Sequence, residues 1–327
     1  MIIRKIPNTG LVLVNESWVV LKDKTTNEFV FCSNLLEEQF RLETPPPVNH
    51  VLMTDENEFI VFLGPKSVFI SNGHIVREEQ KYYFKHSDGI KVYLDLTNAT
   101  TLNYESDAGK HEYPLINSSV KLFLPSHFIQ LVGSEKRVFS LSADPTAREW
   151  GVALDELTQS DTVYSYFELL EIRQKLYFRL ASEKRTGVFC LDLQTGKEVQ
   201  LYDDCSGFLV KDQQFVYSAK FRDKVCVIDT ETDTFHEWDV HQLIQENGFM
   251  TISDHRAAAS NGLLYFTQSL GADFAKVGIL DTTTRQLKWK YDFLPENGAI
   301  GSIHLQGKYL FIHMQDNTLF VFEPELK

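Results

Sequence analysis

One phrase constrains the fold of this chain more than any other feature: KVGILDTTTRQLKWKYDF, from Lys276 to Phe293. Its alternating apolar residues predict a strand that ends at Asp281, followed by a Thr-rich tight turn and a return strand that carries Trp289 and Tyr291. An aspartate side chain can accept hydrogen bonds from the backbone of such a turn. The phrase therefore predicts a β-hairpin.

Related phrases recur along the chain. The clearest copies start at Gly187 (GVFCLDLQTGKEVQLYD) and at Lys224 (KVCVIDTETDTFHEWDV). Weaker copies start at Trp18, Ser67, Lys91 and Arg137. The anchor positions of the phrase lie roughly 37 to 52 residues apart, which is the period of four-stranded propeller blades. These anchors are Ala143, Asp192, Asp229, Asp281 and Glu323.

Each blade is predicted to contain an inner strand, two central strands, a turn with the anchor, and an outer strand. The spacing favours seven blades, with eight as the alternative because Asn72 and Asp95 are only about 23 residues apart. The last phrase stops before an outer strand, and the first residues, Ile2 to Ile6, read as a strand without a hairpin partner. We therefore expect the N-terminal strand to complete the last blade and close the propeller, which removes an exposed sheet edge.

The phrases GVFCLDLQTGKEV and KVGILDTTTRQLKWKYDF resemble the repeats of the quinoprotein-like and WD40/YVTN-like β-propeller superfamily. Those repeats commonly run from an apolar strand through Asp and T-G-K to a strand with Trp; here only Gly196 matches the T-G step. The resemblance implies an all-β fold, with residues 1–327 forming a single β-propeller domain. It implies no cofactor and no activity, because propellers host many functions.

Composition narrows the partners and the compartment. The formal net charge of −13 argues against binding to nucleic acid or to an anionic membrane, which need clustered Lys and Arg. The start lacks a secretory h-region, and no apolar run is long enough to span a membrane. None of the four cysteines forms a C-x-x-C pair, which fits a reducing compartment. We expect a cytoplasmic protein.

Acidic residues recur in the connections from an outer strand to the next inner strand, which emerge on one face of a propeller. These residues are Asp155, Glu156, Asp161, Asp203, Asp204, Glu246 and Glu296. Such a rim attracts a cation or a basic protein surface. The alternative is a solvated rim that contributes solubility and has no partner.

A second group of candidates could face the central channel. Asp254, His255 and Arg256 follow a predicted inner strand, and His304 lies in a later one. The first three could equally form a charge-satisfied turn. The pair His236 and His241 reads as surface histidines, because nothing else in the sequence specifies converging metal ligands.

No familiar catalytic motif occurs in a useful context, so we expect no catalytic residue, no metal and no cofactor. The leading hypothesis is a non-catalytic adaptor or immunity-type propeller that binds a protein with a basic surface through its acidic loops. The alternative is a propeller hydrolase or lactonase with a metal or ligand in the channel. Sugar or peptide binding in the channel is a third possibility.

Overall fold

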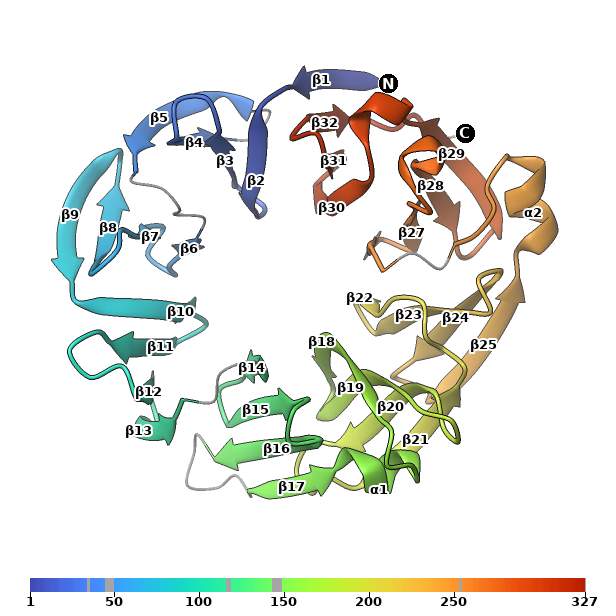
Figure 1. Ribbon diagram of the computed structural model, residues 1–327, viewed down its shortest axis with the longest axis horizontal. Helices are drawn as coiled ribbons and strands as arrows, with labels where there is room; N and C mark the ends of the chain where they lie inside the picture. The colour runs from blue at the N-terminus through green and yellow to red at the C-terminus, as the bar shows by residue number, and fades with distance from the viewer. Residues whose placement is uncertain (34–35, 45–49, 116–118, 143–148, 253–254, 327) are drawn as a thin grey trace. The chain divides into compact units, whose positions relative to one another are not determined.

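The computed structural model describes residues 1–33, 36–44, 50–115, 119–142, 149–252 and 255–326. Within these residues the chain forms eight four-stranded antiparallel sheets, in which strand order follows the sequence except for the first strand. This arrangement confirms the predicted β-propeller of four-stranded blades, and the blade number is eight, the alternative, rather than the favoured seven (Figure 1).

The chain divides into two compact units. The N-terminal unit is residues 8–151, and the C-terminal unit is residues 1–7 together with 152–327. The first two blades of the N-terminal unit are β2 (Thr9–Val14), β3 (Trp18–Asp23), β4 (Glu28–Ser33), β5 (Glu38–Glu43), and β6 (Val51–Met53), β7 (Phe59–Phe62), β8 (Ser67–Ser71), β9 (His74–Glu79). The next two are β10 (Lys81–Ser87), β11 (Ile90–Asp95), β12 (Thr101–Ser106), β13 (Gly109–Pro114), and β14 (Ser119–Phe123), β15 (His127–Val132), β16 (Arg137–Ser142), β17 (Trp150–Ala153).

The C-terminal unit also contains four blades. The first two are β18 (Tyr164–Ile172), β19 (Lys175–Ala181), β20 (Gly187–Asp192), β21 (Glu198–Asp203), and β22 (Val210–Asp212), β23 (Phe215–Lys220), β24 (Lys224–Asp229), β25 (Thr234–Asp239). The last two are β26 (Ala257–Ser260), β27 (Leu263–Gln268), β28 (Lys276–Asp281), β29 (Gln286–Asp292), and β30 (Ile300–Gln306), β31 (Tyr309–Met314), β32 (Leu319–Phe322), β1 (Ile2–Ile6).

The last blade is completed by the N-terminal strand, as predicted. β1 pairs antiparallel with β32 from Ile2 opposite Phe322 to Ile6 opposite Leu319, and the Met1 ammonium group donates a hydrogen bond of 2.9 Å to the Glu323 carbonyl oxygen. Figure 1 shows the blue β1 beside the red β32. The pairing covers the outer edge of β32, which would otherwise present unpaired backbone groups.

Helices are few and short. α1 (Leu154–Thr158) precedes β18, α2 (His241–Glu246) follows β25, and two single 3-10 turns cover residues 272–274 and 295–297. The segment VHQLIQE at residues 240–246, with Asp239 before it as a possible N-cap and Gly248 beyond its end, predicts a short helix, and α2 confirms it. No helix in the described part of the chain has the length and apolar character needed to cross a membrane.

The anchor aspartates explain the difference in blade number. In the C-terminal unit Asp192, Asp229 and Asp281 end the third strand of their blades, whereas Asp23 and Asp95 end the second strand of theirs. The same Asx-type turn, in which the carboxylate accepts backbone N–H bonds, therefore occurs at two different corners of a blade. Its spacing in the first half of the chain does not measure the blade repeat.

Apolar residues on alternate faces of each blade pack against the neighbouring blade in the same unit. In β23, for example, Val216 belongs to a cluster shared with β18–β21, while Tyr217 belongs to one shared with β26–β29. Trp238 and Trp289 lie on outer strands, as predicted, and add to these clusters. The four cysteines are free and buried.

One predicted inner strand is misplaced. The order of the strand candidates predicts the inner strand of this blade at Thr251 to Ser253, ahead of the central strand LLYFTQS, but the inner strand is β26, Ala257–Ser260. Thr251 and Ile252 instead hydrogen-bond to the backbone oxygen of Arg222, and Ser253 lies outside the described residues. The apolar Ile252 belongs to the core, and that is why the segment reads as a strand in the sequence.

Candidate functional site

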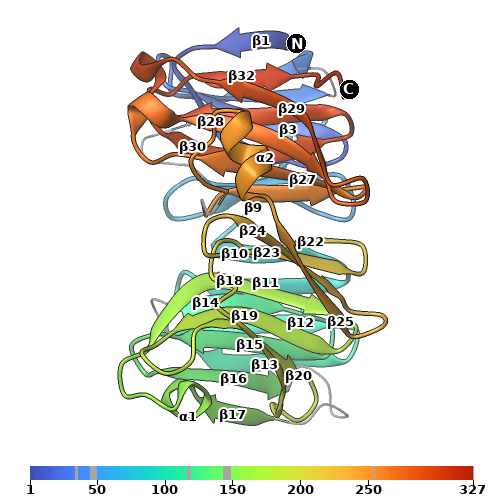
Figure 2. The same cartoon turned by 90° about the vertical axis from the view of Figure 1, so that its right-hand side faces the viewer.

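The connections of the C-terminal unit divide between the two ends of its blades. Because adjacent strands are antiparallel, the second-to-third strand turns and the outer-to-inner connections emerge at the same end. We call this end the loop face. It consists of residues 154–163, 182–186, 204–209, 221–223, 240–252, 255–256, 269–275, 293–299 and 315–318. Figure 2 shows α1 to the left and the end of the β24–β25 hairpin, at the opposite end of the blades, to the right.

Hydrogen bonds join neighbouring segments of the loop face. The Arg185 guanidinium donates to the Leu157 carbonyl oxygen at 2.6 Å, and the Ile252 N–H donates to the Arg222 carbonyl oxygen at 3.0 Å. The Asn297 amide donates to the Asp316 carboxylate, also at 3.0 Å. These bonds connect outer-to-inner connections with second-to-third turns, so the face is a continuous, ordered surface.

Large apolar side chains are exposed at this end. Phe221 is 62% exposed and Met250 is 61% exposed, and four more residues with exposure above two fifths lie on or beside the same loops. These are Tyr164, at the start of β18, and Leu270, Phe274 and Leu294. In the described part of the N-terminal unit the exposed large apolar residues are Ile75 and Val76, both on β9. Exposed apolar side chains gathered at one end of a fold are typical of interaction sites.

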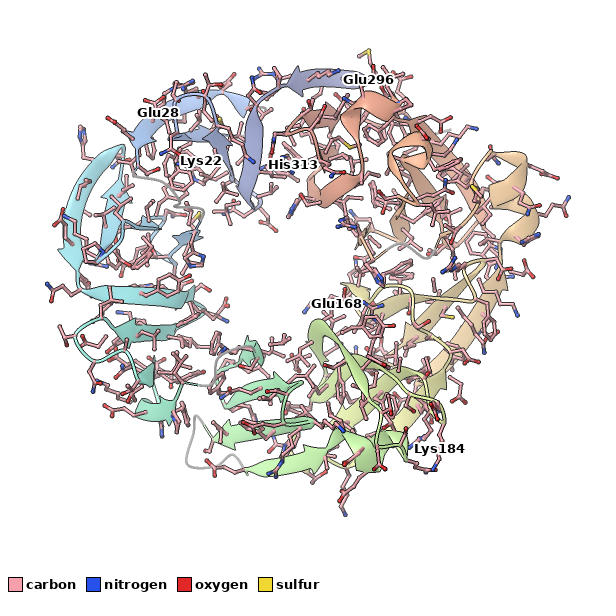
Figure 3. All side chains as sticks on the ribbon, in the orientation of Figure 1. Lys22, Glu28, Glu168, Lys184, Glu296 and His313 are labelled. Carbon is pink, nitrogen blue, oxygen red and sulfur yellow. The ribbon has the colours of Figure 1, made fainter. Side chains whose placement is uncertain are left out.

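The predicted acidic residues lie on or at the edge of this face, on all four outer-to-inner connections. Asp155, Glu156 and Asp161 line an open concavity of about 340 Å³ around α1, which Lys184 also lines (Figure 3). Glu246 lines a second one, of about 800 Å³, around α2. The structure therefore groups these carboxylates into separate concavities rather than one continuous rim.

The other three acidic residues are placed differently. Asp203 is the last residue of β21, and the Asp204 carboxylate lies 3.8 Å from the Lys220 ammonium group. Glu296 lies in the single 3-10 turn before β30 (Figure 3). Lys220 in turn lies 3.0 Å from Glu237, so the charge around Asp204 is partly compensated.

A wide bulge in the inner strand β18 creates the most specific geometry on the face. Ser165 pairs with Leu180 and Leu169 pairs with Phe178, so the three residues from Tyr166 to Glu168 lie opposite Arg179 alone. Bulges of this kind redirect side chains. Here the extra residues bring Tyr166 and Glu168 against the Arg179 guanidinium.

Arg179 is 2% exposed, and its guanidinium is held by favourable contacts on several sides. It donates to Glu168 at 2.8 and 2.6 Å and to the carbonyl oxygens of Ser206 and Gly207, both at 2.6 Å. It also lies over the Tyr166 ring, 4.3 Å from the centroid. Burial raises the pKa of Glu168 above its ordinary value, while Arg179 acts against that shift. The pair fixes the bulge to the loop before β22.

Gly207 allows this loop to approach β23 closely. A Cβ atom there would lie 2.6 Å from the Ala219 Cβ atom, and the Ser206 and Gly207 N–H groups both donate to the Ala219 carbonyl oxygen at 3.0 Å. Only glycine fits such a backbone approach. The loop is thereby held in place from both sides, by Arg179 and by Ala219.

A cavity of about 460 Å³ opens above this arrangement, lined by aromatic, charged and backbone groups. Its lining residues are Tyr166, Thr186, Asp204, Ser206, Gly207, Ala219, Phe221, Arg222 and His255. Three of them have positive φ without being glycine: Asp204 at 61°, Phe221 at 51° and Arg222 at 67°. Backbone strain of this kind costs free energy and persists where the surroundings hold it, and it is often found at functional sites.

His255 is the one predicted channel residue that lines this cavity. Its Nδ1 atom lies 3.1 Å from the Gly207 carbonyl oxygen, which can only accept, so Nδ1 carries the proton and Nε2 is an acceptor in the neutral ring. The ring lies 5.9 Å from the Tyr166 ring, centroid to centroid. His255, which precedes β26, therefore lies against Tyr166 of β18, a strand of a different blade.

The remaining channel candidates have other surroundings. Arg256 donates to the Gly301 carbonyl oxygen at 2.7 Å, and Asp254 lies outside the described residues. Burial, together with the nearby His313, lowers the pKa of His304. In the described part of the chain no hydrogen bond, ion pair or ring contact joins His304 to His255, so the structure does not assemble these candidates into one set.

The two histidines of the His-x4-His pair are also separate. His236 lies on β25, whereas His241 begins α2 with its Nδ1 atom 3.4 Å from the Asp223 carboxylate. Among the residues that the structure describes, no three His, Cys, Asp or Glu side chains are grouped so that they could hold a metal ion.

Sequence reasoning missed Tyr166, Glu168, Arg179, Phe221 and Arg222. Arg179 did leave a signal, because it interrupts the apolar run KLYFRLA on the central strand β19. A buried arginine requires a partner. The width of the bulge and the strained turn at Phe221 depend on contacts between distant segments and leave no local pattern.

Comparisons with known proteins support the fold. No protein-family model matches the chain, and no curated protein matches it in sequence. Similar solved structures include BamB from Moraxella catarrhalis, with a TM-score of 0.60, 10% identity, and coverage of 100% of this chain and 99% of that one. The C-terminal WD40 domain of Sif2 has a TM-score of 0.60 and 12% identity, with coverage of 98% of this chain and 97% of that one. The dihydro-heme d1 dehydrogenase NirN has a TM-score of 0.62 and 12% identity, with coverage of 98% of this chain and 75% of that one. At these identities the similarity shows the β-propeller fold alone.

Proposed function

We propose that this chain is a non-catalytic, protein-binding β-propeller whose loop face receives a partner with a basic surface. The observation that supports this most directly is the coincidence of exposed apolar side chains with carboxylates on one ordered face. Aromatic and Met side chains such as Phe221 and Met250 supply the apolar area that dominates binding energy in interface centres. The surrounding carboxylates steer a basic partner and set its orientation.

The fold does not choose between functions. It is shared by NirN, which is a dehydrogenase, and by a WD40 domain. The choice in favour of protein binding comes from the surface of the C-terminal unit. In this proposal the cavity beside Phe221 takes a side chain of the partner, with Tyr166 and His255 as its walls.

The test uses two loop-face variants of the full chain. The first replaces the exposed apolar residues (Phe221→Ser, Met250→Ser), and the second reverses charge around α1 (Asp155→Lys, Asp161→Lys). The matched control carries Ile75→Ser and Val76→Ser, which remove two apolar side chains of β9 that are 49% and 52% exposed. Proteins captured from native cell extract are identified by mass spectrometry, and each is purified and its association measured at several salt concentrations.

We expect a directly binding partner whose affinity falls at least about tenfold in the apolar variant. The charge variant should mainly slow association and flatten its salt dependence. The control should bind as the wild type does. A partner that binds all three variants equally, or that loses binding only with the β9 control, rules out the loop face.

A further inference from the structure

The blade β22–β25 presents a row of side chains to its neighbour β26–β29, on the face opposite to Cys226. Tyr217, Val227 and His236 are directly paired across β23, β24 and β25, so they form one row on one face of the sheet. Phe215 and Trp238 lie two residues away along their strands and therefore share that face. This row is aromatic and apolar, with one imidazole at its outer end.

The neighbouring blade meets this row with small residues. Gly262, Thr282 and Thr283, together with Arg285, come from its hairpin turns and leave a cavity of about 260 Å³ against the row. Trp238 is consequently half-buried, with no aromatic partner among the described residues. The corresponding residue of the next blade is Tyr291, which pairs with Val277 as Trp238 pairs with Val225, and its ring packs against Phe322 with centroids 4.9 Å apart.

The described side chains that line this cavity include a cation, Arg285, and no carboxylate, although the net charge of the chain is −13. Arg285 lies in the turn between β28 and β29 with a φ of 57°. The Asp281 carboxylate stabilises this turn, because it accepts hydrogen bonds of 2.9 Å from the N–H groups of Thr283 and Thr284. The nearby Asp212 carboxylate accepts the Gly262 N–H at 2.7 Å.

We propose that this inter-blade cavity binds a small aromatic carboxylate. The ring of the ligand would lie between Trp238 and Phe215, where apolar and aromatic contact is available on a surface that is otherwise half-exposed. Its carboxylate would accept hydrogen bonds from the Arg285 guanidinium, which matches a carboxylate in two-point geometry. His236, at the rim, offers a further ring N–H. The turn residues of this site, including Arg285, lie at the end of the blades opposite to the loop face.

The experiment uses phenylacetate as the probe and the full chain as the protein, with binding followed by ligand-observed NMR and by calorimetry. Phenylacetamide, which keeps the ring and lacks the charge, tests recognition of the carboxylate. Arg285→Ala and Trp238→Ala test the two halves of the site. Arg173→Ala is the matched control, because Arg173 is also an exposed arginine at positive φ in a turn, but it does not line this cavity.

We expect a phenylacetate Kd of about 1 mM or below, and at least about tenfold weaker binding of phenylacetamide and in both site variants. Arg173→Ala should bind as the wild type does. Binding that is absent in the wild type, equal for both probes, or unaffected by Arg285→Ala overturns the proposal. The near-UV spectrum and urea midpoint of each variant establish that lost binding does not reflect lost structure.

Discussion

The blade β22–β25 has a neighbour on each side within the C-terminal unit, and its two flanks are closed in different ways. Toward β18–β21, Cys226 and Ile228 pack against Tyr177 and Tyr202, and Arg179 binds the loop before β22. Toward β26–β29, the apolar face continues outward to Trp238, but apart from Arg285 the neighbouring turns supply only glycine and threonine to line the cavity there. The first flank is sealed, and the second opens into a cavity.

The difference teaches that a blade alone does not decide whether its flank is packed. Both faces of β22–β25 are apolar, and both sit against a four-stranded blade. The residues at the turns of the neighbour decide the outcome, because glycine and threonine cannot fill the volume that larger side chains fill. Four substitutions test this, in order of decreasing expected effect.

The largest effect is expected from Arg179→Met, which keeps most of the side-chain length and removes the guanidinium of the sealed flank. Glu168 then lacks its cation, and the Ser206 and Gly207 carbonyl oxygens lose their donor. We expect the free energy of unfolding in urea to fall by about 3–5 kcal/mol. Arg173→Met, which breaks an exposed pair with Glu231, should change it by less than about 1 kcal/mol and serves as the control.

Trp238→Ala removes the aromatic wall of the open flank. Because Trp238 is half-buried and has no aromatic partner among the described residues, we expect a loss of only about 1–2 kcal/mol in the same assay, well below the cost for a fully packed tryptophan. A loss as large as that of Arg179→Met would contradict an open flank.

Glu168→Gln tests the electrostatics of the sealed flank through pH. Burial raises the pKa of Glu168 above its ordinary 4.5, so the folded chain binds this proton more tightly than the unfolded chain does. The associated stability is fully present below pH 4.5 and is lost as the pH rises through the raised pKa. Unfolding free energies of wild type and variant, measured from pH 4 to 7, should therefore diverge with rising pH, with the wild type losing more. Parallel curves would contradict the shift.

The smallest effect on stability is expected from Thr283→Phe, which places a large side chain over the cavity. The Thr283 N–H can keep its bond to Asp281, so the free energy of unfolding should change by no more than about 0.5 kcal/mol. Phenylacetate binding should nevertheless be abolished. Unchanged binding would show that the probe does not occupy the space beside Trp238.

The repeated phrase was sufficient to predict the all-β propeller, because the alternation of apolar residues and the Asx turns at Asp192, Asp229 and Asp281 are local properties. Pairing of β1 with β32 was also predictable, from an incomplete last blade and an unpaired first strand. The blade number was not, since Asp23 and Asp95 use the same turn chemistry at a different corner. Local hydrogen bonding does not record which two strands a turn connects.

The candidate site was less predictable. The sequence placed carboxylates on the outer-to-inner connections, and the antiparallel strand order alone guarantees that these connections share one end of the blades. It did not predict that Phe221 would be exposed while the similar Phe215 and Phe235 are partly covered. It also gave no sign that the rings of His255 and Tyr166 would meet. That contact depends on the bulge in β18, whose extra residues lie opposite Arg179.

The pairing of β1 with β32 has a consequence for how the chain is made. Met1 and Glu323, which share a hydrogen bond, are 322 residues apart along the chain. At ordinary synthesis rates the first strand therefore waits roughly 15–60 s for its partner to leave the ribosome. During that time Ile2, Ile3 and Ile6 form an unpaired apolar segment, and Arg4 and Lys5 between them are gatekeeper charges of the kind that discourage aggregation of such a segment.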